Sequence, residues 1–397
     1  MKDKNLTRSA ILPENKFVRT EDLKQVGHRL ARTVSLGHSE FLAFENEACE
    51  LDYKNRQSAN KKIMQHAQIG FRSLGKTIDA ATSIYETVEK CGFRVDRFGI
   101  CLDWSMGYPK EFRDDKPRGT GLILDSEENF IELANAVPVA PHFGDFVIGM
   151  PAAVENTKAA LRAGSTSIGN LGQYFTFELP GWTNDVQTTE ASICAISLAS
   201  AQNVPILIHS NIDDGFASRF TDLASALGSV LLEQYIVDDL LGGKVSHCYG
   251  HTFSQSLSRF AFQRALKSLT TTPGTMIYGN TTAFSDNDAA NYAVLAAYLN
   301  VDIQAQTLKP SGHAINPVPI TEAQRIPTTE EIIDAQIFCG KLVEKSPNYC
   351  EIINCQSADD LSNRLIKGAN TFKHDVLEGL HDIGIDISDA LELMLSL

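Results

Sequence analysis

The feature that most constrains the fold is an alternation of short apolar runs with longer amphipathic stretches, which starts near Phe41 and continues through most of the chain. Short apolar runs bounded by Gly, Asn or Pro are typical of strands that a parallel sheet buries on both faces. We therefore predict strands at 98–102, 146–149, 165–169, 204–208, 244–249, 275–278 and 301–305.

The amphipathic stretches between these runs predict helices. In one of them Val154 and Leu161 fall on the same side, and Gly164 follows as a stop signal. The predicted helices cover 152–163, 188–201, 216–241, 254–269 and 286–299. Strands and helices that alternate in this way, without a Gly-x-Gly-x-x-Gly motif, favour an α/β fold of the (β/α)8 TIM-barrel type over a doubly wound sheet.

The predicted barrel does not fill the whole chain. Residues 1–35 are polar and predict an N-terminal extension, and the barrel is expected over 36–345. A segment at about 105–140, rich in charge, Gly and Pro, is interpreted as an insertion between barrel units. Residues 346–397 are acidic and predict a C-terminal helical tail.

Composition excludes several classes of protein. Aspartate and glutamate outnumber lysine and arginine by 49 to 35, a formal charge of −14, which argues against binding to nucleic acid or anionic membranes. No apolar run reaches the roughly 20 residues that a membrane helix needs, and residues 1–19 lack the apolar core of a secretory signal. We therefore expect a cytoplasmic protein without a membrane or nucleic-acid partner. We also expect an oligomer.

In a TIM barrel the loops after the strands build the active site, so polar residues just beyond each apolar run are the first candidates. By this rule the candidates are Asp103, Trp104, Asn170, Gln173, Tyr174, His209, Asn211, Asp213, Asp214, His247, Tyr249, His251, Asn280, Thr281 and residues 304–309.

A metal site is one interpretation of these positions. The histidines that could converge at the barrel mouth, as in zinc hydrolases, are His142, His209, His247, His251 and His313. The chain has no His-Glu-x-x-His motif, however, and neutral imidazoles can instead hydrogen-bond to backbone or substrate. We assign no metal ligands. A Gly-x-Ser-x-Gly elbow and a Walker loop are also absent.

Three collinear stretches carry a family resemblance. In the first, over 41–74, Asp52-Tyr53-Lys54-Asn55-Arg56-Gln57 precedes an expected polar helix that ends at 70–74. The second, over 161–192, contains Gly172-Gln173-Tyr174 and Leu179-Pro180-Gly181-Trp182. The third begins at 245 and ends in Thr321-Glu322-Ala323-Gln324-Arg325-Ile326-Pro327-Thr328. Together they resemble the catalytic barrel subunit of coenzyme-B12-dependent glutamate mutase (methylaspartate mutase).

The resemblance implies an adenosylcobalamin-dependent carbon-skeleton isomerase, whose barrel stacks against a separate small cobalamin-binding subunit. The cofactor supplies radical chemistry, while the barrel binds and orients a small-molecule substrate and excludes water. The cobalamin-binding signature Asp-x-His-x-x-Gly is absent from this chain. Any corrinoid is therefore expected to arrive with the partner subunit.

Site roles follow from matched motif positions and from the strand ends. Glu322 matches a glutamate that contacts the adenosyl ribose, and Arg56 matches an arginine that grips a substrate carboxylate. Tyr174 and Trp182 match the aromatic stretch beside the substrate. The predicted catalytic residues are Asn170, Tyr174, His209 and His247, the substrate-binding residues are Arg56, Gln173, Trp182 and Tyr249, and the cofactor-binding residues are Glu322, Asn280 and Gln304.

Departures from the family pattern change the expected substrate. No arginine occurs at 147–149, no acid at 169–171, and no lysine at Val318. A smaller amino acid or small carboxylate therefore fits better than glutamate. Four structural alternatives stay open. Arg56 could pair with Glu45 or Glu47, and Glu322 could cap the next helix, in which Thr328 and Glu331 resemble a capping box. Trp182 could be a core aromatic, and Tyr249 could only fill the barrel mouth. A metal-dependent hydrolase or lyase and a non-catalytic ligand-binding barrel remain alternative functions.

Overall fold

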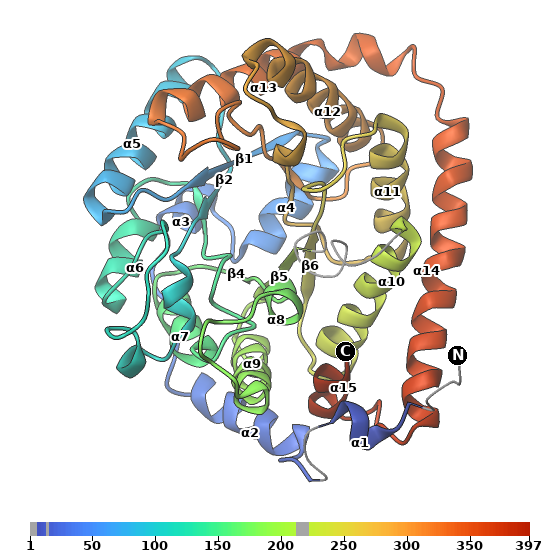
Figure 1. The fold of residues 1–397 in the computed structure, drawn as a ribbon. Coiled ribbons are helices and arrows are strands. Elements are labelled where there is room, and N and C mark those ends of the chain that lie inside the picture. The colour runs from blue at the N-terminus through green and yellow to red at the C-terminus, as the bar shows by residue number, and fades with distance from the viewer. Residues whose placement is uncertain (1–5, 13–15, 212–221) are drawn as a thin grey trace.

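The computed structural model describes residues 6–12, 16–211 and 222–397. It is a mixed α/β structure in which parallel strands lie at the centre and helices lie around them (Figure 1). The strands within the described residues are β1 (Met64–Ile69), β2 (Arg97–Ile100), β3 (Ala140–His142), β4 (Ser167–Gly169), β5 (Leu207–Asn211), β6 (Val245–Cys248), β7 (Met276–Ile277) and β8 (Ala314–Ile315).

Strand pairing forms two sheets, with the orders β3-β2-β1-β8-β7 and β4-β5-β6. Isolated bridges connect them at two places. Phe143, directly after β3, pairs with Ile168 of β4, and Tyr249, directly after β6, pairs with Ile277 of β7. Both bridges and all sheet pairings between these strands are parallel. The carboxyl ends of the strands therefore point to the same side of each sheet.

Helices follow most strands, and polar side chains start several of them. Ser39, Asn184, Asp222 and Asn287 cap α3, α9, α10 and α12, because their side chains accept backbone N–H groups of the first turn. The helices are α1 (Arg8–Ile11), α2 (Thr20–Ala31), α3 (Glu40–Glu45), α4 (Glu50–Ala59), α5 (Leu74–Lys90), α6 (Glu127–Ala134), α7 (Ala153–Arg162), α8 (Gly172–Thr176), α9 (Asp185–Ser200), α10 (Leu223–Gln234), α11 (Ser256–Leu269), α12 (Asp288–Leu308), α13 (Thr329–Cys350), α14 (Gln356–Asp382) and α15 (Ala390–Ser396).

Most of the predicted elements are confirmed. The runs at 98–102, 165–169, 204–208, 244–249 and 275–278 overlap β2, β4, β5, β6 and β7. The stretches at 152–163, 188–201, 254–269 and 286–299 overlap α7, α9, α11 and α12. The stretch at 216–241 overlaps α10 and a π-helical turn (Tyr235–Leu240), although 216–221 lies outside the described residues.

Two predicted strands are wrong. The run at 146–149 is a loop, and the run at 301–305 belongs to α12. In α12 the consecutive residues 302–306 are all buried, so this part of the helix is covered on every side. A short apolar run has the same sequence pattern whether it forms part of a buried helix or a buried strand.

The polar helix expected before residues 70–74 is also wrong, because 64–69 forms β1. The sequence of this strand is Met-Gln-His-Ala-Gln-Ile, and both Gln65 and His66 are buried. Polar side chains inside the structure hide the apolar signal by which a buried strand is usually found. Strands β3 and β8 were also missed, because they are only three and two residues long; His142 lies within β3, and His313 and Asn316 flank β8.

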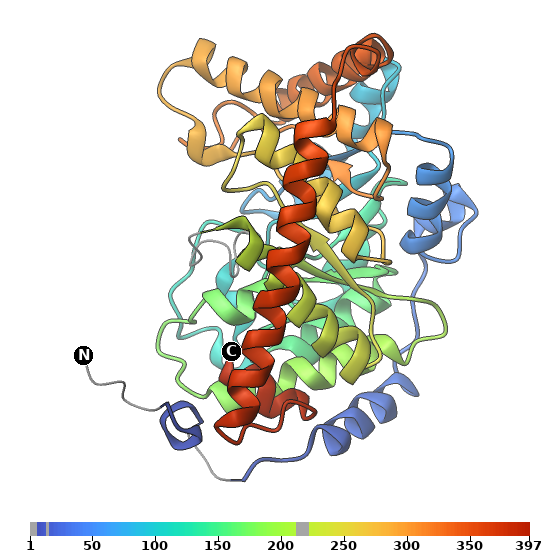
Figure 2. The same cartoon turned by 90° about the vertical axis from the view of Figure 1, so that its right-hand side faces the viewer.

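The two ends of the chain pack against each other. Arg8 of α1 pairs with Glu392 of α15 at 2.8 Å, and Thr20 at the start of α2 donates to Asp389 through its backbone N–H (3.1 Å) and its hydroxyl (2.8 Å). Figure 2 shows α15 beside α1, and the long α14 running along α10 and α11. No helix in the described part of the chain is long and apolar enough to cross a membrane.

Candidate functional site

Helix α4 lies at the amino ends of the strands. Lys54 of this helix donates from Nζ to the carbonyl oxygens of Thr275 and Gly312, both at 3.0 Å. Thr275 directly precedes β7, and Gly312 lies two residues before β8. Glu50 of the same helix accepts a hydrogen bond from Nε of Arg97, the first residue of β2, at 2.8 Å. This buried salt bridge anchors α4 on the side opposite to the expected mouth.

Arg56 is therefore not where the resemblance would put it. It belongs to α4, and its guanidinium pairs with Glu45 (2.6 Å) and Glu47 (2.5 Å) on the surface. These are the partners of the structural alternative, which is confirmed. The assignment of Arg56 to the substrate carboxylate is corrected, because its helix lies at the amino ends of the strands and its charge is already paired.

A layer of buried polar side chains crosses the interior between the strands. Arg97 donates from Nη2 to Oγ of Ser167 (2.9 Å), and its Nη1 lies 3.3 Å from Nδ1 of His66. The rings of His142 and His209 meet edge to face at 4.6 Å. Residues from β1, β2, β3, β4 and β5 thus contribute to one layer.

The histidines of this layer are neutral. Burial, followed by the positive charge of Arg97, holds the pKa of His66, His142 and His209 well below its usual range. His142 Nδ1 lies 3.0 Å from the Ser167 carbonyl oxygen, and His209 Nδ1 lies 2.9 Å from Oγ1 of Thr275. These contacts agree with the interpretation of His209 as a neutral hydrogen-bonding ring.

Glu322 is a perturbed carboxyl group on the side of the strand carboxyl ends. It follows β8, and burial raises its pKa to about 7. It lines a narrow pocket with Gln68 of β1, Tyr278 after β7, Asn316 after β8 and Gln336 of α13. The pocket has a volume of about 10 Å³, which is room for no more than one water molecule. A larger group would contact the half-buried Glu322 from its outer side.

Two buried polar atoms of this pocket have no hydrogen-bond partner among the described residues. They are Nδ2 of Asn316 and Oε1 of Gln336, although Gln336 Nε2 donates to the His66 carbonyl oxygen at 2.8 Å. Unsatisfied buried polar atoms are costly, and in native proteins they often mark a place where a ligand or water binds.

The alternative role of Glu322 as a helix cap is not supported. Helix α13 begins with a capping box made by Thr328 and Glu331, in which each side chain accepts the backbone N–H of the other residue. The predicted box is confirmed, and it leaves the side chain of Glu322 free for another role.

At the ends of β4 and β5, the predicted residues Asn170 and Gln173 hold the backbone. Asn170 Oδ1 accepts N–H groups from Gly172 (2.9 Å) and Asn211 (2.8 Å). Gln173 Oε1 accepts the N–H of Phe146 (2.8 Å). Both residues lie on the expected side of the sheet, and both side-chain oxygens accept hydrogen bonds from the backbone.

His247 and Tyr249 face the helices. His247 Nε2 lies 2.9 Å from Glu233 of α10, which also accepts from Ser210 Oγ (2.6 Å). Tyr249 packs against Phe262 of α11 with ring centroids 5.5 Å apart. Successive strand residues point to opposite faces, so His247 lies on the face away from the layer that holds His209. We therefore correct the pairing of His209 with His247 in one site.

Asn280 and Gln304 differ in position. Asn280 follows β7 and caps a short 3-10 turn (Thr281–Ala283), where its Oδ1 accepts the N–H of Thr282 at 3.0 Å. Gln304 lies within α12 and accepts a hydrogen bond from Cys350 Sγ at 2.8 Å. The cofactor assignment of Gln304 rested on a predicted strand at 301–305, and it is corrected with that strand.

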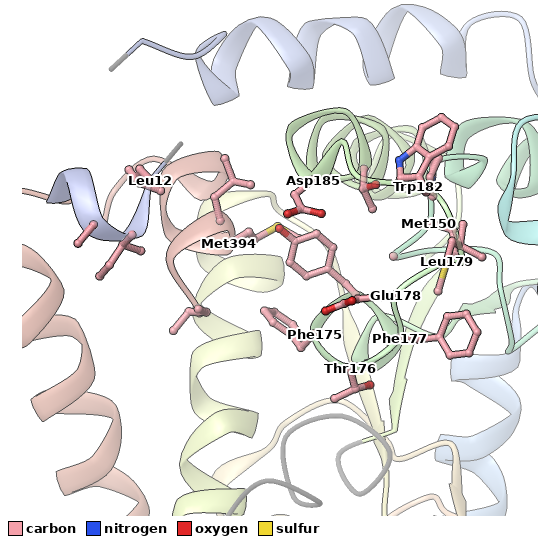
Figure 3. A pocket seen from close by; sticks show the side chains of 18 of the residues that line it. Leu12, Met150, Phe175, Thr176, Phe177, Glu178, Leu179, Trp182, Asp185 and Met394 are labelled. Atoms are coloured by element: carbon pink, nitrogen blue, oxygen red, sulfur yellow. The ribbon is translucent and has the colours of Figure 1, made fainter. Parts of the chain in front are cut away.

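Tyr174 and Trp182 line a cavity separate from the Glu322 pocket. The Tyr174 hydroxyl lies 2.6 Å from Oγ1 of Thr189, and Trp182 Nε1 donates to the Asn184 carbonyl oxygen at 3.3 Å. Figure 3 shows this cavity, which α1, α8 and α15 border. Residues of the second resembling stretch thus lie outside the pocket that holds Glu322.

The five candidate histidines do not form a metal site among the described residues. The one group of three potential ligands with mutually close atoms in that part of the chain is His374, Asp375 and Glu378, which is exposed on α14. Asp213 and Asp214 lie outside the described residues.

The sequence reasoning missed His66, Arg97, Gln68, Cys101 and Asn316. All of them lie in or directly after strands. Burial raises the pKa of Cys101 well above its usual range, with a smaller contribution from the charges of Asp145 and Glu322. Polar residues within otherwise buried strands were the signal that could have found them.

A comparison with protein-family models finds no match, and a comparison with curated proteins finds none either. Function must therefore be argued from the site and from the sequence resemblance.

Proposed function

We propose that the chain is the barrel subunit of an adenosylcobalamin-dependent carbon-skeleton isomerase, related to glutamate mutase and acting on an amino acid or small carboxylate. The proposal includes a closed (β/α)8 barrel. Two observations support closure: the pairing order β3-β2-β1-β8-β7 and β4-β5-β6, and the bridges that join β3 to β4 and β6 to β7. A closed ring of parallel strands would bring all eight carboxyl ends to one mouth.

Glu322 is the observation that carries the functional proposal. It belongs to the most specific of the resembling motifs, follows β8 on the side where barrel enzymes bind substrates, and has a pKa raised to about 7 by burial. A carboxyl group kept in such surroundings without a paired cation costs stability. Such a loss of stability is expected at a residue that serves binding or catalysis.

Glu322 could contact the ribose of the cofactor from its outer side, because a carboxylate accepts hydrogen bonds from two neighbouring hydroxyl groups. The pocket behind it, with the unpartnered Asn316 Nδ2 and Gln336 Oε1, has room for no more than one water molecule. When bound, adenosylcobalamin supplies a radical that abstracts hydrogen from the substrate. Glu322 would hold and orient the sugar, and a separate small cobalamin-binding subunit would bring the corrinoid, since this chain lacks Asp-x-His-x-x-Gly.

The interior layer supports a substrate with little net charge. Arg97 is the guanidinium of this layer, and it already donates to Glu50 and Ser167. The rings of His142 and His209 are neutral and can hydrogen-bond to a polar substrate without clamping a dicarboxylate. We further propose that the protein works in the cytoplasm as an oligomer with its cobalamin-binding partner.

A metal-dependent hydrolase is less well supported. Among the described residues, the candidate histidines do not bring three ligand atoms close together. His247 in addition contacts Glu233 on the helix side of its strand. No specific observation favours a purely ligand-binding role over catalysis.

The test is the visible spectrum and cobalt content of the native protein, purified from cobalamin-fed cells with its co-purifying proteins retained. Corrinoid absorbance, stoichiometric cobalt and a small companion band support the proposal. The matched variants are Glu322→Gln and Glu330→Gln, the second an exposed glutamate of α13. Corrinoid retention that falls in Glu322→Gln alone supports the role of Glu322. A colourless complex without cobalt refutes the proposed function.

A further inference from the structure

A cavity of about 440 Å³ lies between the two ends of the chain and the segment that follows β4 (Figure 3). Helix α1 and helix α15 border one part of it, and α8 with the loop to α9 borders the other. Its volume is within the range of pockets that bind small molecules. The Glu322 pocket shares none of its lining residues.

The lining combines aromatic rings with carboxylates. Tyr174, Phe177 and Trp182 present rings to the cavity, and Glu178 and Asp185 contribute acidic side chains. Figure 3 shows Glu178 and Asp185 between Met394 on one side and Trp182 on the other. The Asp185 charge is close enough to help raise the pKa of Tyr174, behind the larger effect of burial.

The negative charges of this cavity have no positively charged partner in the described part of its lining. Among the described residues that line it there is no lysine, arginine or histidine. Neither Glu178 nor Asp185 forms an ion pair with another described residue, and Tyr174 already uses its hydroxyl on Thr189. A negative, aromatic cavity attracts a cation and offers little to an anion.

We propose that this cavity binds a small organic cation, an ammonium group carried on an apolar body. The ammonium would lie between the carboxylates and the ring faces, where both Coulomb attraction and cation–π contact favour it. The apolar body would contact Met150, Leu179 and Met394. The cavity shares no lining residue with the Glu322 pocket, although Tyr174 and Trp182, which the resemblance places beside the substrate, belong to it.

Three probes of similar size separate charge from shape: benzyltrimethylammonium, neutral benzyl alcohol and anionic phenylacetate. The chain has two tryptophans, so a Trp104→Phe background reports the fluorescence of Trp182 in the cavity wall. Binding is measured on the full chain by fluorescence titration and repeated by calorimetry. The variant is Glu178→Gln/Asp185→Asn, and the control is Glu132→Gln, an exposed acid on α6.

We expect the cation to bind roughly tenfold more tightly than phenylacetate, and the double variant to lose roughly tenfold in affinity for the cation, with Glu132→Gln unchanged. Equal binding of the three probes overturns the proposal, as does a double variant that binds the cation like the wild type. Selectivity among the probes on the Trp104→Phe protein decides the question even if the double variant folds poorly.

Discussion

Replacing Glu322 by glutamine should stabilise the protein at alkaline pH. Burial raises the pKa of this carboxyl group from its ordinary value of 4.5 to about 7. Between these values the folded protein binds a proton that the unfolded chain has released. The free energy of unfolding therefore falls as pH rises through this window, and the loss is complete above pH 7. Glutamine resembles the protonated carboxyl group and does not ionise.

The size of the effect follows from the shift. Each pKa unit corresponds to about 1.4 kcal/mol, and Glu322 is half-buried, so partial screening by solvent leaves an expected gain of about 2 kcal/mol at pH 8. At pH 4.5 the gain should be close to zero. The free energy of unfolding is measured by urea denaturation of wild type and Glu322→Gln at several pH values, with Glu330→Gln as control.

The dependence on pH is what tests the reasoning. A gain that appears only as pH rises from 4.5 to 8 supports an isolated, poorly solvated carboxyl group. A difference between wild type and Glu322→Gln that stays constant across this range would refute it, because a packing change alone has no pH dependence. Destabilisation at pH 8 would mean that the carboxylate has a favourable partner, contrary to its raised pKa.

Three further predictions concern the framework. Arg259→Met should lower the free energy of unfolding by about 3–5 kcal/mol in urea melts, because Asp302, which Arg259 now bonds at 2.6 and 2.8 Å, stays buried without its cation. The double variant Arg259→Met/Asp302→Leu should recover much of the lost stability. A double variant that loses as much stability as Arg259→Met would contradict the pairing. Arg56→Ala should lower the free energy of unfolding by less than about 1 kcal/mol in thermal melts, because solvent screens the ion pairs that Arg56 makes with Glu45 and Glu47. A larger loss would show that these ion pairs contribute more to stability than surface pairs usually do. Thr328→Ala should cost about 1 kcal/mol by chemical unfolding, and no loss would mean that the capping box is dispensable.

The sequence predicted the parts of the fold whose side chains follow the apolar pattern. The strands β2, β4, β5, β6 and β7 contain short apolar runs and were found in order. Strand β1 was missed because buried Gln65 and His66 interrupt its apolar residues. The run at 301–305 shows the opposite error, since the long helix α12 buries an apolar side as completely as a strand would. Periodicity fails where the interior is polar and where a helix is fully covered.

The candidate site could be predicted only in part, for a different reason. Glu322 was identified from a motif, and its perturbed pKa agrees with a functional role that stays a prediction. Arg56 was misplaced because a motif match does not show at which end of the strands a helix lies. His66 and Arg97 were missed because they contact each other across strands, and such contacts depend on register. A single sequence does not reveal register between strands far apart in the chain.

For the proposed isomerase, the arrangement of charge favours a substrate that is less anionic than glutamate. A dicarboxylate needs cations that are free to bind it, and removing them from existing partners costs free energy. Arg97 is bonded to Glu50, while Lys54 donates to two carbonyl oxygens and lies 3.5 Å from the same Glu50. Both cations thus stabilise the amino-end side of the strands. On the carboxyl-end side, Glu322 has a raised pKa and would repel an anion once ionised. A substrate with one carboxylate, or with an amino group that balances it, would be repelled less there than a dicarboxylate. The absence of arginine at residues 147–149 agrees with this expectation.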